Sequence, residues 1–386
     1  MTATKTCDIA VIGAGVFGAW TAHFLRQSGA SVTLIDAYGP ANGRASSSGE
    51  TRIIRMGYGP DELYTRWSGR SLLLWREFFA RIGVDLFRRT GVLWLSSDSD
   101  PYTAGMFDVL SRADVKHEKL AASDIRKRWP QMIFEDVSSA IFEHESGVLM
   151  ARRAVQELMR DTVSHGAYYL SGVALPPKAR GKLREVQIAN EERVSAGQFV
   201  FACGAWLPKL FPSIVGDRIF PTRQEVFFLG TPAGDNNFRS PQMPAWLHHT
   251  HPDRPYALPN IEERGFKIAF DRHGPEFDPD SSDRVVGQTS IERLRAYLKQ
   301  HIPALQNAPV IETRVCQYEN TWNGDFLIDR HPEAENVWLV GGGSGHGFKH
   351  GPAVGEYVSA RLLHNAPPEP RFSLDSKQAD RKRAIY

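Results

Sequence analysis

The chain has 386 residues, 42% hydrophobic and 23% charged, which allows roughly two or three structural units with an ample core. Its formal net charge of +2 gives no basis for binding nucleic acid or a membrane surface, and no apolar stretch approaches membrane-spanning length. A signal-peptide pattern is absent and the three cysteines are too few for a disulfide framework, so we expect a cytoplasmic protein.

The first element in chain order is a βαβ unit from Asp8 to Asp36. Residues 9–12 predict a buried strand, an amphipathic helical pattern follows, and residues 31–35 predict a second strand that ends at Asp36. The strand enters the helix through G-x-G-x-x-G, whose glycines are Gly13, Gly15 and Gly18. Glycines let the backbone approach a pyrophosphate at a helix N-terminus, and the terminal acid can bind a ribose diol. The unit predicts dinucleotide binding over a simple packing turn, without separating FAD from NAD.

An arginine pair follows the small, polar loop of residues 37–50. Arg52 and Arg55 flank two apolar residues. Isolated arginine pairs usually form surface salt bridges. Here the preceding loop would lie beside the nucleotide, which favours a role in the site.

The middle of the chain mixes helices and strands. Apolar patterns predict helices over residues 63–79, 152–165 and 290–301, a strand over residues 90–95, and a helix that begins at 123–124 and ends at 129–130. Residues 168–202 alternate apolar runs with polar turns, as in a small β-meander, and their last strand could return to the nucleotide sheet.

Three histidines lie together in a proline- and histidine-rich stretch: His248, His249 and His251. Their spacing could bind a metal, but no cysteine or carboxylate stands at zinc-like spacing. We therefore predict a solvated loop and no metal site.

A second strand–glycine loop–helix element lies near the C-terminus. A strand at 336–340 leads into the glycine-rich residues 341–355 and a helix at 354–363. Because one dinucleotide needs only one pyrophosphate turn, a second glycine turn indicates contact with another part of a large cofactor, such as an isoalloxazine ring. This favours FAD over NAD. The polar tail after Pro370 is predicted to be mobile.

Nearly the whole chain resembles one group of proteins, the monomeric sarcosine oxidase and N-methyltryptophan oxidase group of the D-amino-acid-oxidase-like flavoproteins. The most specific motifs are CQYENTWNGDFLID (316–329) and GGGSGHGFKHG (341–351). The others are GAGVFG, GETRIIRMGYG, TGVLWL, RWP, FEHESGVL, ACGAW and GFK.

The resemblance implies an α/β (α+β) fold with two interleaved domains and a monomeric protein. A Rossmann-like FAD-binding domain is expected from residues 1–86, 146–220 and 317–386. A mixed-sheet substrate domain is expected from residues 87–145 and 221–316.

The resemblance also implies that FAD is attached covalently through Cys316, although a lone cysteine is more often a small buried residue. Together, the motifs and the resemblance give these cofactor-binding residues: Gly13, Gly15, Val16, Gly18, Asp36, Ala37, Ser47, Thr51, Arg52, Val173, Cys316, Gly343, Gly345, His346, Gly347 and Lys349.

The same resemblance implies the catalytic roles. Arg52 would lie against the flavin and Lys267 on its opposite face, where a cation favours oxygen reduction. Arg55 and Lys349 would grip the substrate carboxylate. The amine pocket would be lined by Tyr256 and Tyr318.

Four positions depart from sarcosine-type members. Asp271 replaces a histidine four residues after Lys267, Ser47 and Ser48 replace a histidine pair, and Met56 replaces another histidine. An acid at Asp271 could pair with a substrate cation or with Arg55, so sarcosine itself is not the expected substrate.

The predicted function is FAD-dependent oxidation of a carboxylate-bearing secondary amine, an N-methyl or cyclic amino acid, to an imine, with molecular oxygen reduced to hydrogen peroxide. One alternative is a dehydrogenase of the same fold that passes electrons to a protein or quinone. Another is a non-catalytic flavin-binding subunit. An NAD-dependent dehydrogenase would leave Cys316 and the second glycine block unexplained.

Overall fold

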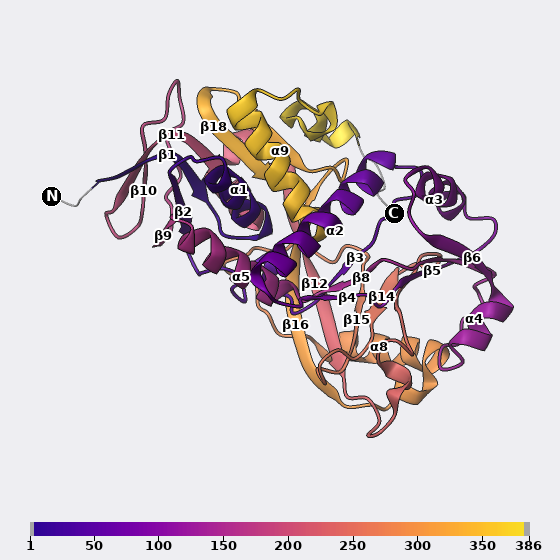
Figure 1. Cartoon of the computed structure of the whole chain (residues 1–386). Coiled ribbons are helices and arrows are strands. Elements are labelled where there is room, and N and C mark those ends of the chain that lie inside the picture. The colour runs from indigo at the N-terminus through magenta and orange to yellow at the C-terminus, as the bar shows by residue number, and fades with distance from the viewer. Residues whose placement is uncertain (1–3, 382–386) are drawn as a thin grey trace.

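The computed structural model describes residues 4–381 and has two lobes, with the long helix α2 (Glu62–Ile82) lying over their junction (Figure 1). The first lobe contains a seven-stranded sheet in the order β17-β18-β11-β1-β2-β9, with β10 paired to β11. Its strands are β1 (Thr4–Ile12), β2 (Val32–Asp36), β9 (Tyr168–Ser171), β10 (Glu185–Gln187), β11 (Arg193–Phe201), β17 (Leu327–His331) and β18 (Ala334–Gly341).

The central strands of this sheet are parallel, as expected for a nucleotide-binding fold. β1 pairs with β2 on one side and β11 on the other, and β11 pairs with β18. The prediction that residues 199–202 return to this sheet is confirmed. The predicted β-meander is wrong for its first strand, because β9 pairs in parallel with β2. Antiparallel pairing follows later in this stretch, where an isolated bridge joins Ala174 to Ile188 and β10 pairs with β11. The run Phe199–Phe201 is completely buried, which suits a central parallel strand.

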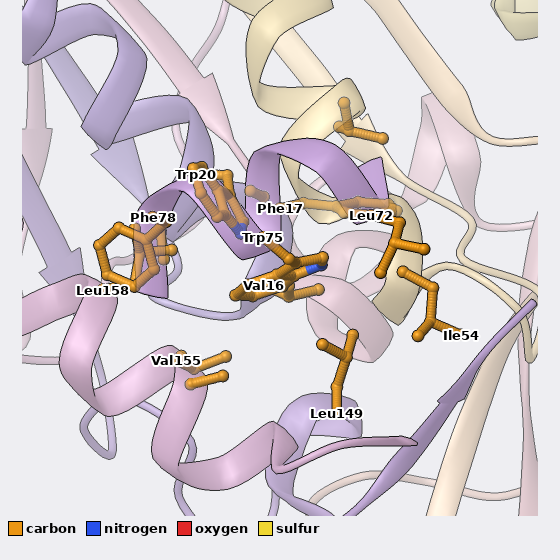
Figure 2. Close-up of a cluster of buried hydrophobic side chains, with 14 of the residues drawn as sticks. Val16, Phe17, Trp20, Ile54, Leu72, Trp75, Phe78, Leu149, Val155 and Leu158 are labelled. Carbon is orange, nitrogen blue, oxygen red and sulfur yellow. The ribbon is translucent and has the colours of Figure 1, made fainter. Parts of the chain in front are cut away.

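Four helices and their apolar faces form the main core of the first lobe. α1 (Val16–Gln27) packs against α5 (Ala151–Ser164) and α9 (Gly351–His364), and α9 packs in turn against α2. Trp20 of α1 and Trp75 of α2 meet edge to face, with ring centroids 5.0 Å apart, beside Phe78 (Figure 2). Both indoles are fully buried, and burying a large aromatic side chain stabilises a fold by roughly 1.5–3 kcal/mol. This packing fixes the N-terminus of α1, where the glycine turn lies.

The second lobe contains an eight-stranded mixed sheet in the order β16-β12-β15-β14-β13-β5-β7-β6. Its strands are β5 (Val92–Ser96), β6 (His117–Ala121), β7 (Ser139–Glu143), β12 (Ile219–Leu229), β13 (Ala245–His248), β14 (Pro255–Leu258), β15 (Phe266–Phe270) and β16 (Val310–Thr321). A small sheet joins the lobes: β3 (Arg52–Ile54), β4 (Phe87–Arg88) and β8 (Gly147–Leu149). The remaining helices are α3 (Pro101–Arg112), α4 (Ala122–Arg128), α6 (Leu207–Leu210), α7 (Pro212–Val215) and α8 (Gln288–His301).

Two long strands, β12 and β16, pass from one lobe toward the other. They pair antiparallel from Ile219↔Thr321 to Leu229↔Val310. The domain limits predicted at residues 220 and 316 fall inside these continuous strands, and the domain assignment stays a prediction. None of the helices within residues 4–381 is long and apolar enough to cross a membrane.

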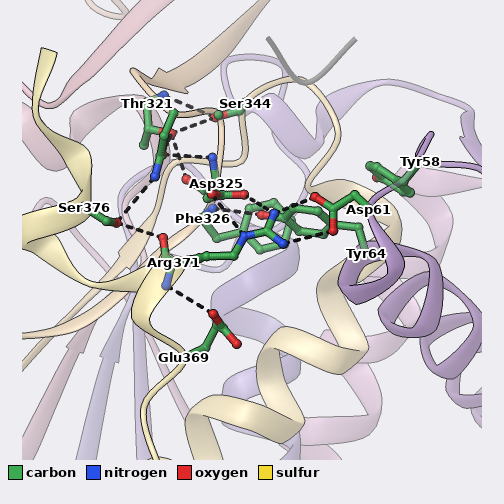
Figure 3. A network of polar contacts seen from close by, with 12 residues as sticks. Tyr58, Asp61, Tyr64, Thr321, Asp325, Phe326, Ser344, Glu369, Arg371 and Ser376 are labelled. Carbon is green, nitrogen blue, oxygen red and sulfur yellow. Dashed lines mark hydrogen bonds and ion pairs between the residues drawn. The ribbon is translucent and has the colours of Figure 1, made fainter. Parts of the chain in front are cut away.

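The C-terminal segment is anchored as far as it is described. Arg371 forms ion pairs with Asp61 at 2.6 Å and with Asp325 at 2.7 Å (Figure 3). These carboxylates raise the pKa of the guanidinium against the effect of burial. Short 3-10 turns follow over residues 370–381, so the prediction of a mobile tail is wrong for this stretch. Residues 382–386 lie outside the described part.

The histidine stretch is also different from the prediction. His248 is the last residue of β13 and is fully buried, and His249 is only 9% exposed. Burial follows from the position of β13 between β5 and β14 in the sheet, which the sequence pattern did not reveal. The predicted solvated loop is therefore wrong for these two histidines.

Candidate active site

A cavity of about 350 Å³ runs along the carboxyl ends of the parallel strands, where α/β sheets bind their ligands. The segments that line it include the β1–α1–β2 unit and the loop after it, the residues after β9 and after β11, residues 317–319, and the second glycine loop. The predicted cofactor residues that line it are Gly13, Gly15, Val16, Asp36, Ala37, Ser47, Arg52, Val173, Gly343, Gly345 and Gly347.

Close packing requires glycine at two positions of the first glycine turn. A Cβ at Gly13, whose φ is +105°, would lie 2.3 Å from the carbonyl oxygen of Ala202. A Cβ at Gly18 would lie 1.9 Å from the carbonyl oxygen of Gly13. Gly15 differs, because its nearest neighbour would be the Ser47 hydroxyl at 3.5 Å. Gly13 and Gly18 thus hold helix and strand together, and Gly15 leaves backbone open to the cavity.

The acid at the end of β2 organises the turn. The Asp36 carboxylate accepts hydrogen bonds from the Ala14 N–H at 2.7 Å and from two N–H groups of the following turn. Burial raises the pKa of Asp36, and these hydrogen bonds oppose the rise. The Val16 N–H donates to the Ser47 hydroxyl at 3.0 Å, which ties the loop before Arg52 to the start of α1.

The second glycine loop presses against the first. A Cβ at Gly347 would lie 2.9 Å from the Phe17 ring of α1. Gly345 has a φ of +77°, and a Cβ there would lie 2.7 Å from the Tyr318 ring. Side chains at these positions would close the space that the two loops enclose.

Glu319 is a buried carboxylic acid that sequence reasoning missed, although it lies inside the CQYENT motif. It lines the large cavity and accepts a hydrogen bond from the Gly343 N–H. Burial raises its pKa to about 7. Within residues 4–381, its Oε2 has no hydrogen-bond partner. An acceptor without a partner beside two glycine turns fits a large dinucleotide cofactor with hydroxyl groups to donate.

A second cavity, of about 70 Å³, adjoins the first and brings the predicted substrate residues together. Arg52, Tyr318 and Gly345 line both cavities. The smaller cavity is also lined by Arg55, Tyr256, Asp271, Cys316, His346 and Lys349.

Lys349 and Arg55 are both almost completely buried. The Lys349 ammonium donates to the Tyr58 hydroxyl at 2.8 Å and to the His346 carbonyl at 2.9 Å. Burial, and then the nearby Arg55, hold the pKa of Lys349 well below its usual range. A carboxylate in this cavity would offset both effects.

Arg55 is held by residues that sequence reasoning did not assign. Its guanidinium lies between the rings of Tyr58 and Trp94, 4.5 Å from each centroid, and donates to the Gly57 carbonyl. The buried Glu143 accepts hydrogen bonds from the Gly57 N–H at 3.0 Å and from the Trp94 indole at 2.8 Å. The motifs GYG, VLWL and FEHESG contain these residues, but only the fold shows that all of them help to position Arg55.

The small cavity is also lined by an acid and two phenols. Tyr318 donates to Asp271 at 2.6 Å. Burial raises the pKa of Tyr256. Asp271, the residue that departs from sarcosine-type members, therefore faces the same space as Arg55 and Lys349.

A third cavity, of about 230 Å³, contains the predicted oxygen lysine beside Arg52 and Cys316. Lys267 is 2% exposed and donates to the Thr51 carbonyl at 2.7 Å. Burial, and then Arg52, hold its pKa well below the usual range. The Cys316 sulfur lies 3.7 Å from an Arg52 nitrogen. Thr51 thus contacts Lys267 rather than the large cavity.

Comparison with known proteins identifies the family. The model of the FAD dependent oxidoreductase family matches residues 8–361, and the chain belongs to that family. This establishes the predicted flavoprotein relationship and the α/β fold.

Two curated relatives match over nearly the whole chain. Monomeric sarcosine oxidase from Bacillus sp. (strain NS-129) is 30% identical over 379 residues, covering 97% of each chain. N-methyl-L-tryptophan oxidase from Yersinia pestis (strain Pestoides F) is 27% identical, covering 93% of this chain and 95% of the relative. Among solved structures, L-proline dehydrogenase from P.horikoshii superposes with a TM-score of 0.86 at 21% identity, covering 99% of this chain and 100% of that one.

Proposed function

We propose that this flavoprotein oxidises a carboxylate-bearing secondary amine, an N-methyl or cyclic amino acid, to an imine, and that molecular oxygen accepts the electrons to give hydrogen peroxide. One observation carries the proposal: the two buried cations Arg55 and Lys349 line a small cavity that adjoins the cofactor cavity. The sarcosine and N-methyl-L-tryptophan oxidases among the relatives support the substrate class.

The carboxylate of the substrate is assigned to Arg55 and Lys349. The Lys349 ammonium donates to two neutral acceptors, the Tyr58 hydroxyl and the His346 carbonyl oxygen. A buried cation is stabilised by an anionic partner, and a guanidinium can bind a carboxylate through two hydrogen bonds. Anchoring this end orients the amine toward the larger cavity.

The amine end is assigned to the wall with Asp271 and Tyr318. A secondary amine is protonated near neutral pH and must lose its proton before it can be oxidised. Asp271, which accepts a hydrogen bond from Tyr318 at 2.6 Å, attracts the ammonium form and is placed to accept that proton. FAD, when bound, supplies the chemistry of accepting two electrons from the amine and passing them on.

Oxygen reduction is assigned to the third cavity, and the cofactor link to Cys316. Lys267 and Arg52 give that cavity a positive field, which favours electron transfer to oxygen. Cys316 lines both this cavity and the amine cavity, consistent with a thioether link to the ring edge. We also propose a monomeric, cytoplasmic protein, in line with its three unpaired thiols.

The first test is anaerobic mixing of the purified protein with a panel of amines, with loss of the oxidised-flavin absorbance as the readout. The panel contains sarcosine, N-methyltryptophan, proline, pipecolate and primary amino acids. Bleaching by one carboxylate-bearing class supports the proposal and names the substrate type. If no carboxylate-bearing amine reduces the flavin, the assignment of Arg55 and Lys349 is wrong.

The identity of the electron acceptor, molecular oxygen, is tested separately with Lys267→Met. Removal of this cation should slow flavin reoxidation by oxygen far more than flavin reduction by the amine. Stopped-flow measurement of each half-reaction, with hydrogen peroxide counted per turnover, gives the answer. Equal reoxidation rates in the variant and the wild type would show that Lys267 takes no part in oxygen reduction. A peroxide yield near zero would favour the dehydrogenase alternative.

A further inference from the structure

A cluster of metal-binding side chains lies in the second lobe, outside the three cavities of the active site. His248 is the last residue of β13, and His301 is the last residue of α8. Asp136 belongs to the segment between α4 and β7. One ligand atom from each of the three residues lies within 4.8 Å of the others. Residues far apart in the sequence thus meet at one point.

The burial of the cluster is graded. The His248 side chain is fully buried, His301 is 8% exposed, and the Asp136 side chain is 48% exposed. The Asp136 carboxylate lies 2.8 Å from His248 Nε2. The cluster therefore has a nitrogen-rich inner side and one carboxylate at the solvent edge, which leaves a route for an ion to enter.

Hydrogen bonds on the far side of each imidazole fix its orientation. His301 Nδ1 lies 2.9 Å from the Ile133 carbonyl oxygen. A carbonyl only accepts, so Nδ1 carries the hydrogen and the neutral ring presents a lone pair at Nε2. His248 Nδ1 lies 3.1 Å from the Tyr297 hydroxyl, an oxygen that can accept in the same way. This outer hydrogen bonding is what metal-binding histidines show.

We propose that Asp136, His248 and His301 bind one divalent transition-metal cation, with Zn²⁺ as the representative ion. Two imidazoles and one carboxylate are a ligand set that suits zinc, and water at the exposed edge completes a four-coordinate site. In the metal-free protein, His248 Nε2–H donates to the Asp136 carboxylate at 2.8 Å. When the metal binds, the ring proton moves to Nδ1, where the Tyr297 hydroxyl accepts it, and the metal takes its place between Nε2 and Asp136, so the ring stays neutral.

The neighbouring His251 provides a contrast within the same cluster of rings. Its centroid lies 5.2 Å from that of His248 and 6.0 Å from that of His301. Its Nδ1, however, accepts a hydrogen bond from the Asp253 N–H at 3.1 Å, so the neutral ring carries its hydrogen on Nε2. His251 is therefore not a ligand, and His251→Gln is a matched control.

The role of the site is structural. The ion joins three segments that are far apart in the sequence, because 112 residues separate Asp136 from His248 and 53 separate His248 from His301. Leu247, beside His248 on β13, lines the amine cavity. Bound metal thus stiffens the strand that forms one wall of that cavity without touching the reacting atoms.

The test uses the full-length flavin-containing protein, freed of metal with a chelator and titrated with Zn²⁺ by calorimetry. The wild type should bind one ion and show a higher thermal midpoint with Zn²⁺ than without. Asp136→Asn and His301→Gln should each lower the affinity by at least ~100-fold, because even loss of an outer-shell partner costs ~10–100-fold. His251→Gln should bind as the wild type does.

Co²⁺ provides a second readout, since its visible bands report tetrahedral nitrogen and oxygen coordination in the wild type and should vanish in Asp136→Asn. Asp136 is half exposed, so this variant should fold even if His301→Gln does not. Absence of stoichiometric Zn²⁺ binding in the wild type would overturn the proposal. So would equal affinity in the wild type and Asp136→Asn, and the cluster would then be a hydrogen-bonded chain of Asp136, His248 and Tyr297.

Discussion

Replacement of Arg55 by methionine gives the sharpest test of how the substrate is held. The side chain is 4% exposed and lies between two aromatic rings, so methionine can occupy the same slot without opening a large void. The change removes the guanidinium and leaves Lys349 as the remaining cation of the pair. Stability should change little compared with substrate affinity.

The magnitude follows from the lost hydrogen bonds. A hydrogen bond to a charged group contributes about 1.5–3 kcal/mol, and a bidentate guanidinium–carboxylate pair has two. Allowing for partial compensation by Lys349, we expect a loss of about 3–4 kcal/mol, or ~150- to 1,000-fold in affinity. Arg55→Lys keeps the charge but not the planar fork, and should lose only ~10- to 30-fold.

The assay is the anaerobic reduction of the flavin at increasing amine concentration, which gives a Kd and a limiting rate for each variant. Each amino acid is compared with the amine that lacks its carboxylate. Arg55→Met should weaken binding of the amino acid strongly. It should weaken binding of the simple amine by less than ~3-fold, because the simple amine makes no contact that the change removes. Equal losses for both, or a loss below ~5-fold for the amino acid, would refute the assignment of Arg55 to the carboxylate.

Three further predictions concern the cofactor. Cys316→Ser should abolish covalent flavin, so that flavin fluorescence no longer migrates with the denatured polypeptide on a gel; fluorescence that persists would place the link elsewhere. Burial raises the pKa of Glu319 from 4.5 to about 7. In flavin-free protein, the free-energy cost of ionising Glu319 is therefore absent below pH 4.5, grows as the pH rises, and reaches its full value above pH 7. Relative to Glu319→Gln, the wild type should lose about 3 kcal/mol of unfolding free energy across that range in urea titrations, and parallel pH profiles would contradict this. Gly18→Ala forces a Cβ to within 1.9 Å of the Gly13 carbonyl oxygen, so it should destabilise the protein by about 1–3 kcal/mol or more and weaken FAD retention, and an unchanged thermal midpoint would contradict the packing role.

Much of the cofactor site was predictable because its signals are local. The strand, the glycine turn, the helix and Asp36 lie within one continuous stretch, and the 3.6-residue and 2-residue periods report helices and strands directly. The second glycine loop was recognisable for the same reason. The catalytic positions, in contrast, came from family resemblance, since a single Lys267 within a strand carries no signal of its own.

Residues whose importance depends on distant partners were missed. Glu143 contacts the backbone after Arg55 across 86 residues, and Glu319 is notable only because its environment is buried beside Gly343. The anchoring of Arg371 by Asp61 spans 310 residues. No short-range pattern contains such a pairing.

The sequence by itself determined the nucleotide-binding unit, the helices that cover it and the preference for FAD, because backbone hydrogen bonding and apolar periodicity act over a few residues. Tertiary structure decided which side chains meet. Placement of β13 between β5 and β14 buries His248. The C-terminal end of α8 brings His301 to it, and the segment between α4 and β7 brings Asp136. Burial and close contact depend on the order of strands in a sheet, and that order is set by the packing of the whole chain.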